Sequence, residues 1–525
     1  MSSLTRLLGV LVLAAGSASP LLAQSTATSP AARRAVETIT EADFQARVGV
    51  LAHDSMRGRD TPSPQLEQAA KWVASEFRRV GLTPAGDDGS FIQHVTLRRS
   101  RPDPASAVTV AGNGTATTLS LGREIAFLGG PAPASRTELP LVLMAGIPAD
   151  LEHPFGDIPV RDKAVILFAP PDRLQNSVLN PLLAAATAEG VGAWIVASDL
   201  PPDQWDRLAA RSLAGDRWEL PGSAQDSHDG PGLYFVQHRS LGAFLTAAGE
   251  EPVSLMAASP ARVWAVDGAE VALEPAWNVT PDLRVPNVVG VLEGSDPTLR
   301  DEAVVFVAHM DHVGVTANGR CGAVGADSIC NGANDNASGT AGVMELAEAY
   351  ASMHPRPRRT MVFVTVAAEE RGLLGSAYYV EHPVVPLERT VAAINFDMLA
   401  RNDPESIQLI AKAYSTLGTT ADEVAAAHPE LHMAPVIDES QHGFAFQSSD
   451  HYPFAVKGVP VLFFFSGLHP DLHGPTDSPE NADFDKAARV ARLAFYIGLE
   501  VANADGRPQW DPKAKASVME RSTGH

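Results

Sequence analysis

Ala303-Val304-Val305-Phe306-Val307-Ala308 is an uninterrupted apolar run that leads directly to His309 and, two residues later, to Asp311. Such a run is typical of a strand that is buried on both faces of a sheet. Three further apolar runs also lead to polar residues: Thr360 to Ala368 ends at Glu369-Glu370, Thr390 to Phe396 at Asp397, and Val459 to Phe465 leads to His469 and His473. Because strand-like and helix-like segments alternate from about 286 to 500, we predict an α/β fold with crossover helices.

The polar residues that follow these strands are those that bind metals in proteins. In open α/β sheets ligands bind at the carboxyl ends of the strands, so these side chains are expected to face one crevice. Asp335, just before the helical pattern of Thr340 to Met353, adds a further carboxylate. Histidine together with Asp and Glu suits zinc, with manganese or cobalt as substitutes. One carboxylate shared between two ions would give a co-catalytic pair.

Each of these residues also has a structural explanation when it is taken alone. Asp335 could cap the helix that follows it, and Glu369-Glu370 could begin a solvated loop. Ten of the 16 histidines lie between His309 and His473, however. Five or more metal-competent groups at one end of one sheet favour a shared site.

Five short motifs, taken together and in this order, resemble the co-catalytic zinc exopeptidases. This is the bacterial leucyl-aminopeptidase-like family, which also contains glutamate carboxypeptidase and the glutaminyl cyclases. The motifs are Ala308-His309-Met310-Asp311-His312, Asn334-Asp335-Asn336-Ala337-Ser338-Gly339, Ala368-Glu369-Glu370-Arg371-Gly372, Asn395-Phe396-Asp397 and Asp471-Leu472-His473-Gly474-Pro475-Thr476-Asp477. The resemblance covers about 286–500, with a weaker match over about 37–95. It implies a mixed central sheet flanked by helices, of the zinc-exopeptidase or phosphorylase/hydrolase-like type.

The resemblance also implies a role for each site residue. The metal ligands would be His309, Asp335, Glu370, Asp397 and His473, with two zinc ions bridged by Asp335. Glu369 would be the general base, and Asp311 would orient His309. The order within Glu369-Glu370 rests on the resemblance alone, since either glutamate could be the ligand. His469 is the alternative to His473.

The rest of the chain divides by texture, and the predicted boundaries are as follows. They are a signal peptide at 1–23, a linker at 24–36, the N-terminal part of the peptidase domain at 37–115, an insert at 116–285, the peptidase domain with the metal site at 286–505, and a flexible tail at 506–525. The insert has short strands (Leu139 to Ala145, Ala164 to Ala169, Ala193 to Ala197) between Pro- and Gly-rich turns. It resembles a protease-associated domain, that is, a smaller β-rich α/β domain.

Composition limits the partners and the compartment. The chain has 525 residues with 40 Lys+Arg against 62 Asp+Glu, a net charge of −22, which disfavours nucleic acids and anionic membrane surfaces. Arg6 and the apolar run from Leu7 to Ala15 are typical of a secretory signal. We therefore expect export to the periplasm or the medium, with no stable membrane span. Export would permit a Cys321–Cys330 disulfide.

Other motifs in the second half predict less. Ser448-Ser449-Asp450-His451 holds the residue types of a hydrolase triad, but neighbours in sequence seldom form one, and no Gly-x-Ser-x-Gly occurs. Asp450 and His451 are expected at the rim of the site. Phe444, Phe446 and Tyr452 are expected in the core rather than in a substrate pocket.

These observations favour a secreted two-metal aminopeptidase that acts on peptides with a free N-terminus. Carboxypeptidase, dipeptidase and glutaminyl-cyclase chemistry on the same metal centre are the alternatives among enzymes. A binding scaffold that has lost its metals is the alternative from another class, and the intact ligand set argues against it.

Overall fold

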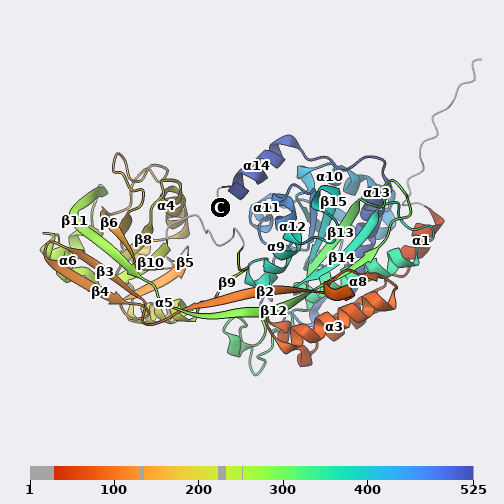
Figure 1. Ribbon diagram of the computed structural model, residues 1–525, viewed down its shortest axis with the longest axis horizontal. Coiled ribbons are helices and arrows are strands. Elements are labelled where there is room, and N and C mark those ends of the chain that lie inside the picture. Colours follow the sequence, from red (N-terminus) through yellow and green to blue (C-terminus); the bar gives the residue numbers. More distant parts are fainter. Residues whose placement is uncertain (1–28, 130–134, 223–231, 251, 524–525) are drawn as a thin grey trace, which may run out of the picture.

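The computed structural model describes residues 29–129, 135–222, 232–250 and 252–523. Two separate sheets organise these residues. The long strands β2 (Ile92–Pro102) and β12 (Trp277–Leu292) pair antiparallel and run as a ribbon from one body to the other (Figure 1). We call the larger body the main domain and the smaller body the insert.

The sheet of the main domain is mixed and contains ten strands. Its order is β17-β16-β18-β15-β13-β14-β12-β2-β9, with β1 paired to β12. Strands β13, β14, β15 and β18 are parallel to their neighbours in this group, whereas β12 and β16 run antiparallel to it. The remaining bounds are β1 Thr83–Pro84, β9 Arg217–Glu219, β13 Ala303–His309, β14 Thr360–Val366, β15 Thr390–Asp397, β16 Ser406–Ile410, β17 Ala434–Val436 and β18 Val461–Phe465. The predicted fold class is confirmed.

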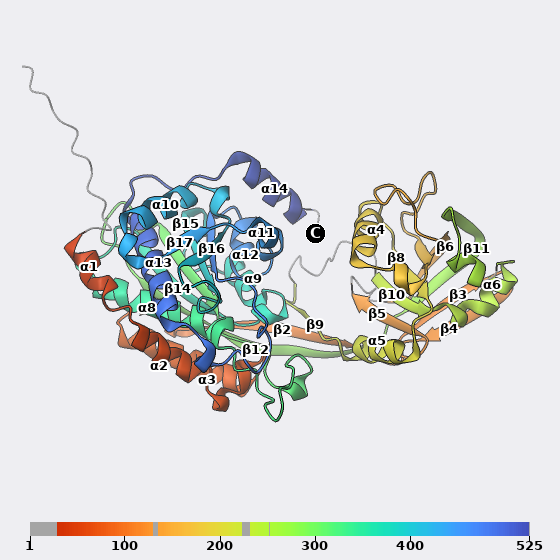
Figure 2. The ribbon, with the colours of Figure 1, turned by 180° about the vertical axis from the view of Figure 1, so that it is seen from behind.

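Helices cover both faces of this sheet, which explains its continuous apolar runs. Alternate residues of β13 point to opposite faces: Val304 and Phe306 pack in one hydrophobic cluster, and Val305 and Val307 in the other. The first cluster includes α2 (Glu41–Leu51), α3 (Pro64–Arg79), α8 (Gly339–Ser352), α10 (Leu417–Ala427) and α13 (Phe484–Asn503). The second includes α9 (Leu374–Glu381), α12 (His451–Val456) and α14 (Pro512–Thr523). Figure 2 shows α2, α3, α8 and α13 beside the sheet.

The insert has its own eight-stranded sheet, in the order β4-β3-β11-β6-β7-β8-β10-β5. Its strands are β3 Ala107–Gly112, β4 Thr115–Ser120, β5 Ile125–Gly129, β6 Thr137–Ala145, β7 Ala164–Phe168, β8 Ala193–Ser198, β10 Gly232–Gln237 and β11 Arg262–Glu274. Its helices are α4 Asn176–Ala188, α5 Pro202–Ala214, α6 Gly242–Ala247 and α7 Pro252–Met256. Strands β3 and β4 belong to this sheet, while β12 belongs to the main sheet. The predicted insert boundaries, 116–285, are therefore wrong by about ten residues at each end.

The predicted linker and tail also differ from the structure. Part of the 24–36 linker is helix α1 (Pro30–Val36), whose Ala32 and Ala35 are buried. The 506–525 tail contains α14, and Val518 of that helix is buried in the main core. The Trp510 indole Nε1 donates to the Gly458 carbonyl at 2.9 Å, which fixes the start of this segment. The predicted signal peptide, 1–23, lies outside the described residues. No helix in the described ranges is both long enough and apolar enough to cross a bilayer.

Candidate metal centre

The predicted site residues emerge from one end of the main sheet. His309 is the last residue of β13 and Asp397 the last residue of β15. Glu369 and Glu370 begin a 3₁₀ turn shortly after β14, and His473 lies in the loop after β18. These four strands are parallel neighbours, so their carboxyl ends meet at one edge.

Asp335 reaches the same edge because the loop before α8 is fastened to the segment that follows β15. Asn334 Oδ1 accepts the Ala400 N–H at 2.7 Å, and Ser338 Oγ accepts the Leu399 N–H at 3.0 Å. Behind the loop, the Asp477 carboxylate accepts the N–H groups of Asn334 and Asp335, both at 2.9 Å. The backbone of Asp335 is therefore held from two sides.

The donor atoms of these side chains form two groups that share Asp335. In the first group, His309 Nε2 lies 3.3 Å from Asp397 Oδ1 and 3.5 Å from Asp335 Oδ1. In the second, His473 Nε2 lies 3.2 Å from both Asp335 Oδ2 and Glu370 Oε1. The two oxygens of Asp335 thus face different groups. All five predicted ligands are brought together.

His312 completes the second group and is the residue that our sequence analysis missed. Its Nδ1 lies 3.1 Å from Glu370 Oε1 and 3.5 Å from Asp335 Oδ2. The signal was its place in the motif that follows β13, three residues after His309.

The donor set fits a pair of metal ions. His309 Nε2, His312 Nδ1, Glu370 Oε1 and Asp397 Oδ1 are buried and have no hydrogen-bond partner among the described residues. Buried polar atoms in native proteins are almost always satisfied, so this cluster of orphaned atoms calls for a cation. Mixed imidazole and carboxylate donors suit zinc.

The electrostatics of the cluster point the same way. Burial disfavours the charged form of His473, but the close contacts of its Nε2 with the Asp335 and Glu370 carboxylates outweigh burial and raise its pKa to about 10. Burial would raise the pKa of Glu370, yet its contacts with His312 and His473 hold it well below the usual value. The Glu370 carboxylate of the second group therefore stays ionised beside positive charge, whereas burial raises the pKa of Asp397 in the first group although His309 acts in the opposite direction.

Glu369 stands beside the first group but is not part of it. Its Oε2 lies 3.9 Å from His309 Nε2. Burial, reinforced by the Glu370, Asp397 and Asp450 carboxylates, raises its pKa well above the usual value, and His309 acts in the opposite direction. Glu369 is thus a carboxylate beside the cluster that belongs to neither donor group.

Asp311 lies behind His309 and Glu369 and contacts both. One carboxylate oxygen lies 3.8 Å from His309 Nδ1, and that nitrogen is closer, at 3.2 Å, to the Asp311 backbone carbonyl. The carboxylate accepts the Thr61 hydroxyl at 2.6 Å and the Glu369 N–H at 3.3 Å. Its contacts are therefore consistent with positioning, mainly of the Glu369 turn.

A disulfide-closed loop borders the second group. Cys321 and Cys330 are bonded, with their Cα atoms 5.8 Å apart. Arg320, next to this bond, places Nη2 3.0 Å from Glu370 Oε2.

The remaining predicted residues divide between the neighbourhood of the site and the core. His469 contacts Asn334 and belongs to neither group. Asp450 and His451 were expected at the rim, but both are fully buried: Asp450 accepts the Ser376 hydroxyl at 2.6 Å, and His451 stacks on Phe463. They are enclosed because α12 begins at His451 and packs in the second hydrophobic cluster. Phe446 is in the core as expected, Tyr452 packs against it half-buried, and Phe444 is 66% exposed.

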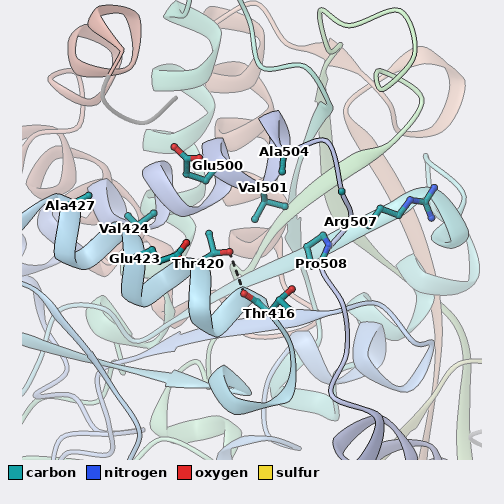
Figure 3. A pocket seen from close by; sticks show the side chains of 11 residues that line it. Thr416, Thr420, Glu423, Val424, Ala427, Glu500, Val501, Ala504, Arg507 and Pro508 are labelled. Atoms are coloured by element: carbon teal, nitrogen blue, oxygen red, sulfur yellow. Dashed lines mark hydrogen bonds between the residues drawn. The ribbon is translucent and has the colours of Figure 1, made fainter. Parts of the chain in front are cut away.

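A cavity of about 420 Å³ lies elsewhere, between α10 and the C-terminal end of α13 (Figure 3). Its charged lining residues are Glu423, Glu500 and Arg507. Arg507 is engaged by the Glu302 carboxylate at 2.7 Å. None of the predicted site residues lines this cavity, so the strand-end cluster remains the candidate site.

Comparison with known proteins locates the same part of the chain. The family model of peptidase family M28 matches residues 287–498. Aminopeptidase YwaD of Bacillus subtilis (strain 168) is 29% identical over 223 residues, which are 40% of this chain and 46% of that protein. Leupeptin-inactivating enzyme 1 of Streptomyces exfoliatus is 33% identical over 153 residues, 27% of this chain and 31% of that protein. The chain thus spans less than half the length of these two relatives.

A solved structure extends the similarity of fold over most of the chain. The aminopeptidase from Aneurinibacillus sp. strain AM-1 superposes with a TM-score of 0.51 at 17% identity. The superposition covers 91% of this chain and 98% of the other. At this identity it shows a shared fold.

Proposed function

We propose that the protein is a zinc-dependent exopeptidase that releases N-terminal residues from peptides, and the match of residues 287–498 to the model of peptidase family M28 supports this proposal. The observation that carries the proposal is the sharing of Asp335 by two donor groups, one oxygen to each. Two zinc ions, with manganese or cobalt as substitutes, would be held by His309, Asp335 and Asp397 and by Asp335, Glu370 and His473. The matched relatives named aminopeptidases support this choice.

The chemistry divides between the ions and the chain. Bound zinc supplies Lewis acidity for the scissile carbonyl and for the attacking water. Glu369 is the general base: its Oε2 accepts the proton of that water and returns it to the leaving amine. Glu369 belongs to neither donor group, so its carboxyl group is free to hold that proton between the two transfers. Asp311 holds the Glu369 turn through the Glu369 N–H.

We further propose that the protein is exported, with residues 1–23 as the signal. The bonded pair Cys321–Cys330 supports this proposal, because disulfides persist in oxidising compartments and are rare in reducing ones. Peptides with a free N-terminus are the proposed substrates.

A panel of short peptides tests the proposed function. Free dipeptides and tripeptides, their N-acetylated forms and their C-terminal amides are incubated with the zinc-loaded protein, with and without chelator. We expect cleavage that requires a free amine, tolerates the amide and stops with chelator. Cleavage that requires a free carboxylate would instead indicate a carboxypeptidase or dipeptidase. Cyclisation of N-terminal glutamine would indicate a cyclase, and no turnover by the zinc-loaded protein would indicate a scaffold.

A further inference from the structure

We propose that His312 is a fourth protein ligand of the ion held by Asp335, Glu370 and His473, which makes the two metal positions inequivalent. One position has four protein donors, and the other, at His309, has three and keeps a place open for substrate. The inference rests on the two-metal centre of the proposed function and adds to it both a ligand and an order of binding.

The burial of His312 provides the first argument. Its side chain is fully buried, and neither Nδ1 nor Nε2 has a hydrogen-bond partner among the described residues. A buried imidazole with both nitrogens unsatisfied is unfavourable unless a further group binds it. The nitrogen that faces the cluster is Nδ1, which is the atom near Asp335 and Glu370.

The surroundings of His312 hold its ring in this position. Its backbone N–H donates to the Arg59 carbonyl at 3.3 Å. Its ring stands edge-on to the His473 ring, with 5.5 Å between centroids. Gly332 has a φ of 59°, and a Cβ there would lie 2.6 Å from two atoms of the His312 ring. Glycine at position 332 therefore leaves space for the His312 ring, and a side chain at this position would displace the ring.

The distances provide the second argument. Zinc–nitrogen and zinc–oxygen bonds of about 2.0–2.1 Å place tetrahedral donor atoms about 3.3–3.4 Å apart. The four contacts given above between His312 Nδ1 or His473 Nε2 and the carboxylate oxygens of Asp335 and Glu370 are 3.1, 3.5, 3.2 and 3.2 Å. Four donors at this spacing match one closed tetrahedral set.

The first group has no such fourth donor among the described residues. His309, Asp335 and Asp397 are its three members, and the next carboxylate, Glu369, stays 3.9 Å from His309 Nε2. Structural zinc sites use four protein ligands, whereas catalytic sites use three and leave one position free. The position at His309, beside the proposed base, is therefore the exchangeable one, and the position at His312 is the retained one.

Zinc content measured at buffered free zinc tests this assignment. The full-length protein is loaded with Zn²⁺ and dialysed against a chelator series, and bound zinc per chain is measured by mass spectrometry. We expect the wild type to lose one equivalent well before the other. His312→Phe keeps a flat aromatic ring but has no donor atoms, and His312→Asn is the second variant. In both variants the retained equivalent should be lost at a free zinc concentration at least about 100-fold higher than in the wild type. Mutation of residues that only hydrogen-bond to a metal ligand already lowers the affinity by about 10–100-fold.

His428→Asn is the matched control. His428 is also buried, stacks on Tyr496 at 3.7 Å and lies outside both donor groups. It should retain both zinc ions as the wild type does. The assignment would be overturned if folded His312 variants lost the retained equivalent only at the same free zinc concentration as the wild type.

X-ray absorption at the zinc edge of the wild type gives a readout that needs no variant. Three imidazoles shared between two ions support the proposal, and two imidazoles overturn it, even if both His312 variants fail to fold. The peptide panel tests the proposed function separately. If the protein bound two zinc ions but cleaved no peptide, the proposed function would fail while the number of imidazole ligands would still be three.

Discussion

Glu369 combines three properties at the scale of a single residue: it is nearly buried, it lies beside His309, and it belongs to neither donor group. Glu369→Gln preserves shape and hydrogen bonding but removes the basic oxygen. General acid–base groups contribute about 10²–10⁴-fold to rate, so kcat should fall by about that factor while zinc content stays at two per chain. Glu370→Gln is the control, and it should lose zinc. Near-wild-type turnover by Glu369→Gln would exclude it as the base.

His469 predicts a pH dependence of stability. Its Nε2 lies 3.0 Å from Asn334 Nδ2, the donor end of an amide whose oxygen is already bound to Ala400 N–H, so the ring must accept and remain neutral. Burial, aided by the charge of Arg401, lowers its pKa to about 4. Between pH 4 and 6.5 the unfolded chain therefore binds the extra proton.

The free energy of unfolding therefore decreases by up to about 3 kcal/mol as the pH falls from about 6.5 to 4. Above pH 6.5 the contribution of the neutral His469 to stability is fully present. Denaturant unfolding of wild type and His469→Asn at pH 7, 6 and 5 measures the effect. The stability advantage of the wild type should shrink at each step. A difference that does not change with pH would contradict a neutral His469.

The sequence was sufficient for the residues that end strands and insufficient for those placed by other contacts. His309 and Asp397 could be predicted because each directly follows an apolar run. His312 follows His309 by three residues, but nothing local shows that its ring faces the cluster, because that placement depends on Arg59 and Gly332, which lie far apart in the chain. Asp450 was misplaced for a similar reason, because the burial of a polar residue at the start of α12 depends on its partner Ser376 in α9.

Between elements, Arg59 joins three segments around the site. Its guanidinium donates to Leu51 O at the end of α2, to Met310 O after β13, and to the carbonyls of Asn331 and Gly332, at 2.6–3.0 Å. Arg59→Met would leave these carbonyls without their donor. Hydrogen bonds to charged groups contribute about 1.5–3 kcal/mol each and are not additive, so we expect a loss of at least about 3 kcal/mol in the free energy of unfolding.

Arg57→Met, at an exposed position in the same turn, is the control and should change stability by less than about 0.5 kcal/mol. Urea unfolding of the zinc-free proteins measures both without a contribution from metal binding. Equal stability of the two variants would contradict the role given to Arg59.

The periodic elements were predictable, and the irregular ones were not. The apolar residues between Leu66 and Val80 recur on one helical face, and this pattern is enough to predict α3 from the sequence. Helix α14 has too few apolar residues to be recognised, and its place depends on Val518 and on the Trp510 contact with Gly458. The insert boundaries were displaced because β3 and β12 read alike as strands, and only pairing assigns them to different sheets.

At the scale of the whole molecule, the two bodies have separate cores. The hydrophobic clusters around the insert sheet contain only residues from 108 to 273 among those described. The connection is the β2–β12 ribbon, on which β9 also pairs and Leu220 packs (Figure 1). The metal cluster lies entirely in the main domain. We therefore predict two calorimetric transitions, of which only one depends on zinc.

The size of that dependence follows from linkage. Zinc at about 1,000 times its dissociation constant adds about 4 kcal/mol to the state that binds it. At about 2–4 °C per kcal/mol for a domain of roughly this size, chelation should lower the main-domain Tm by about 10 °C. The insert transition should stay within about 1 °C, because a ligand stabilises only the cooperative unit that binds it. Asp335→Asn removes the carboxylate that both donor groups share. Without chelator it should give the same profile as the chelated wild type, which separates loss of metal from other effects of the chelator. A single transition that moves as a whole would mean that the ribbon couples the two bodies into one cooperative unit.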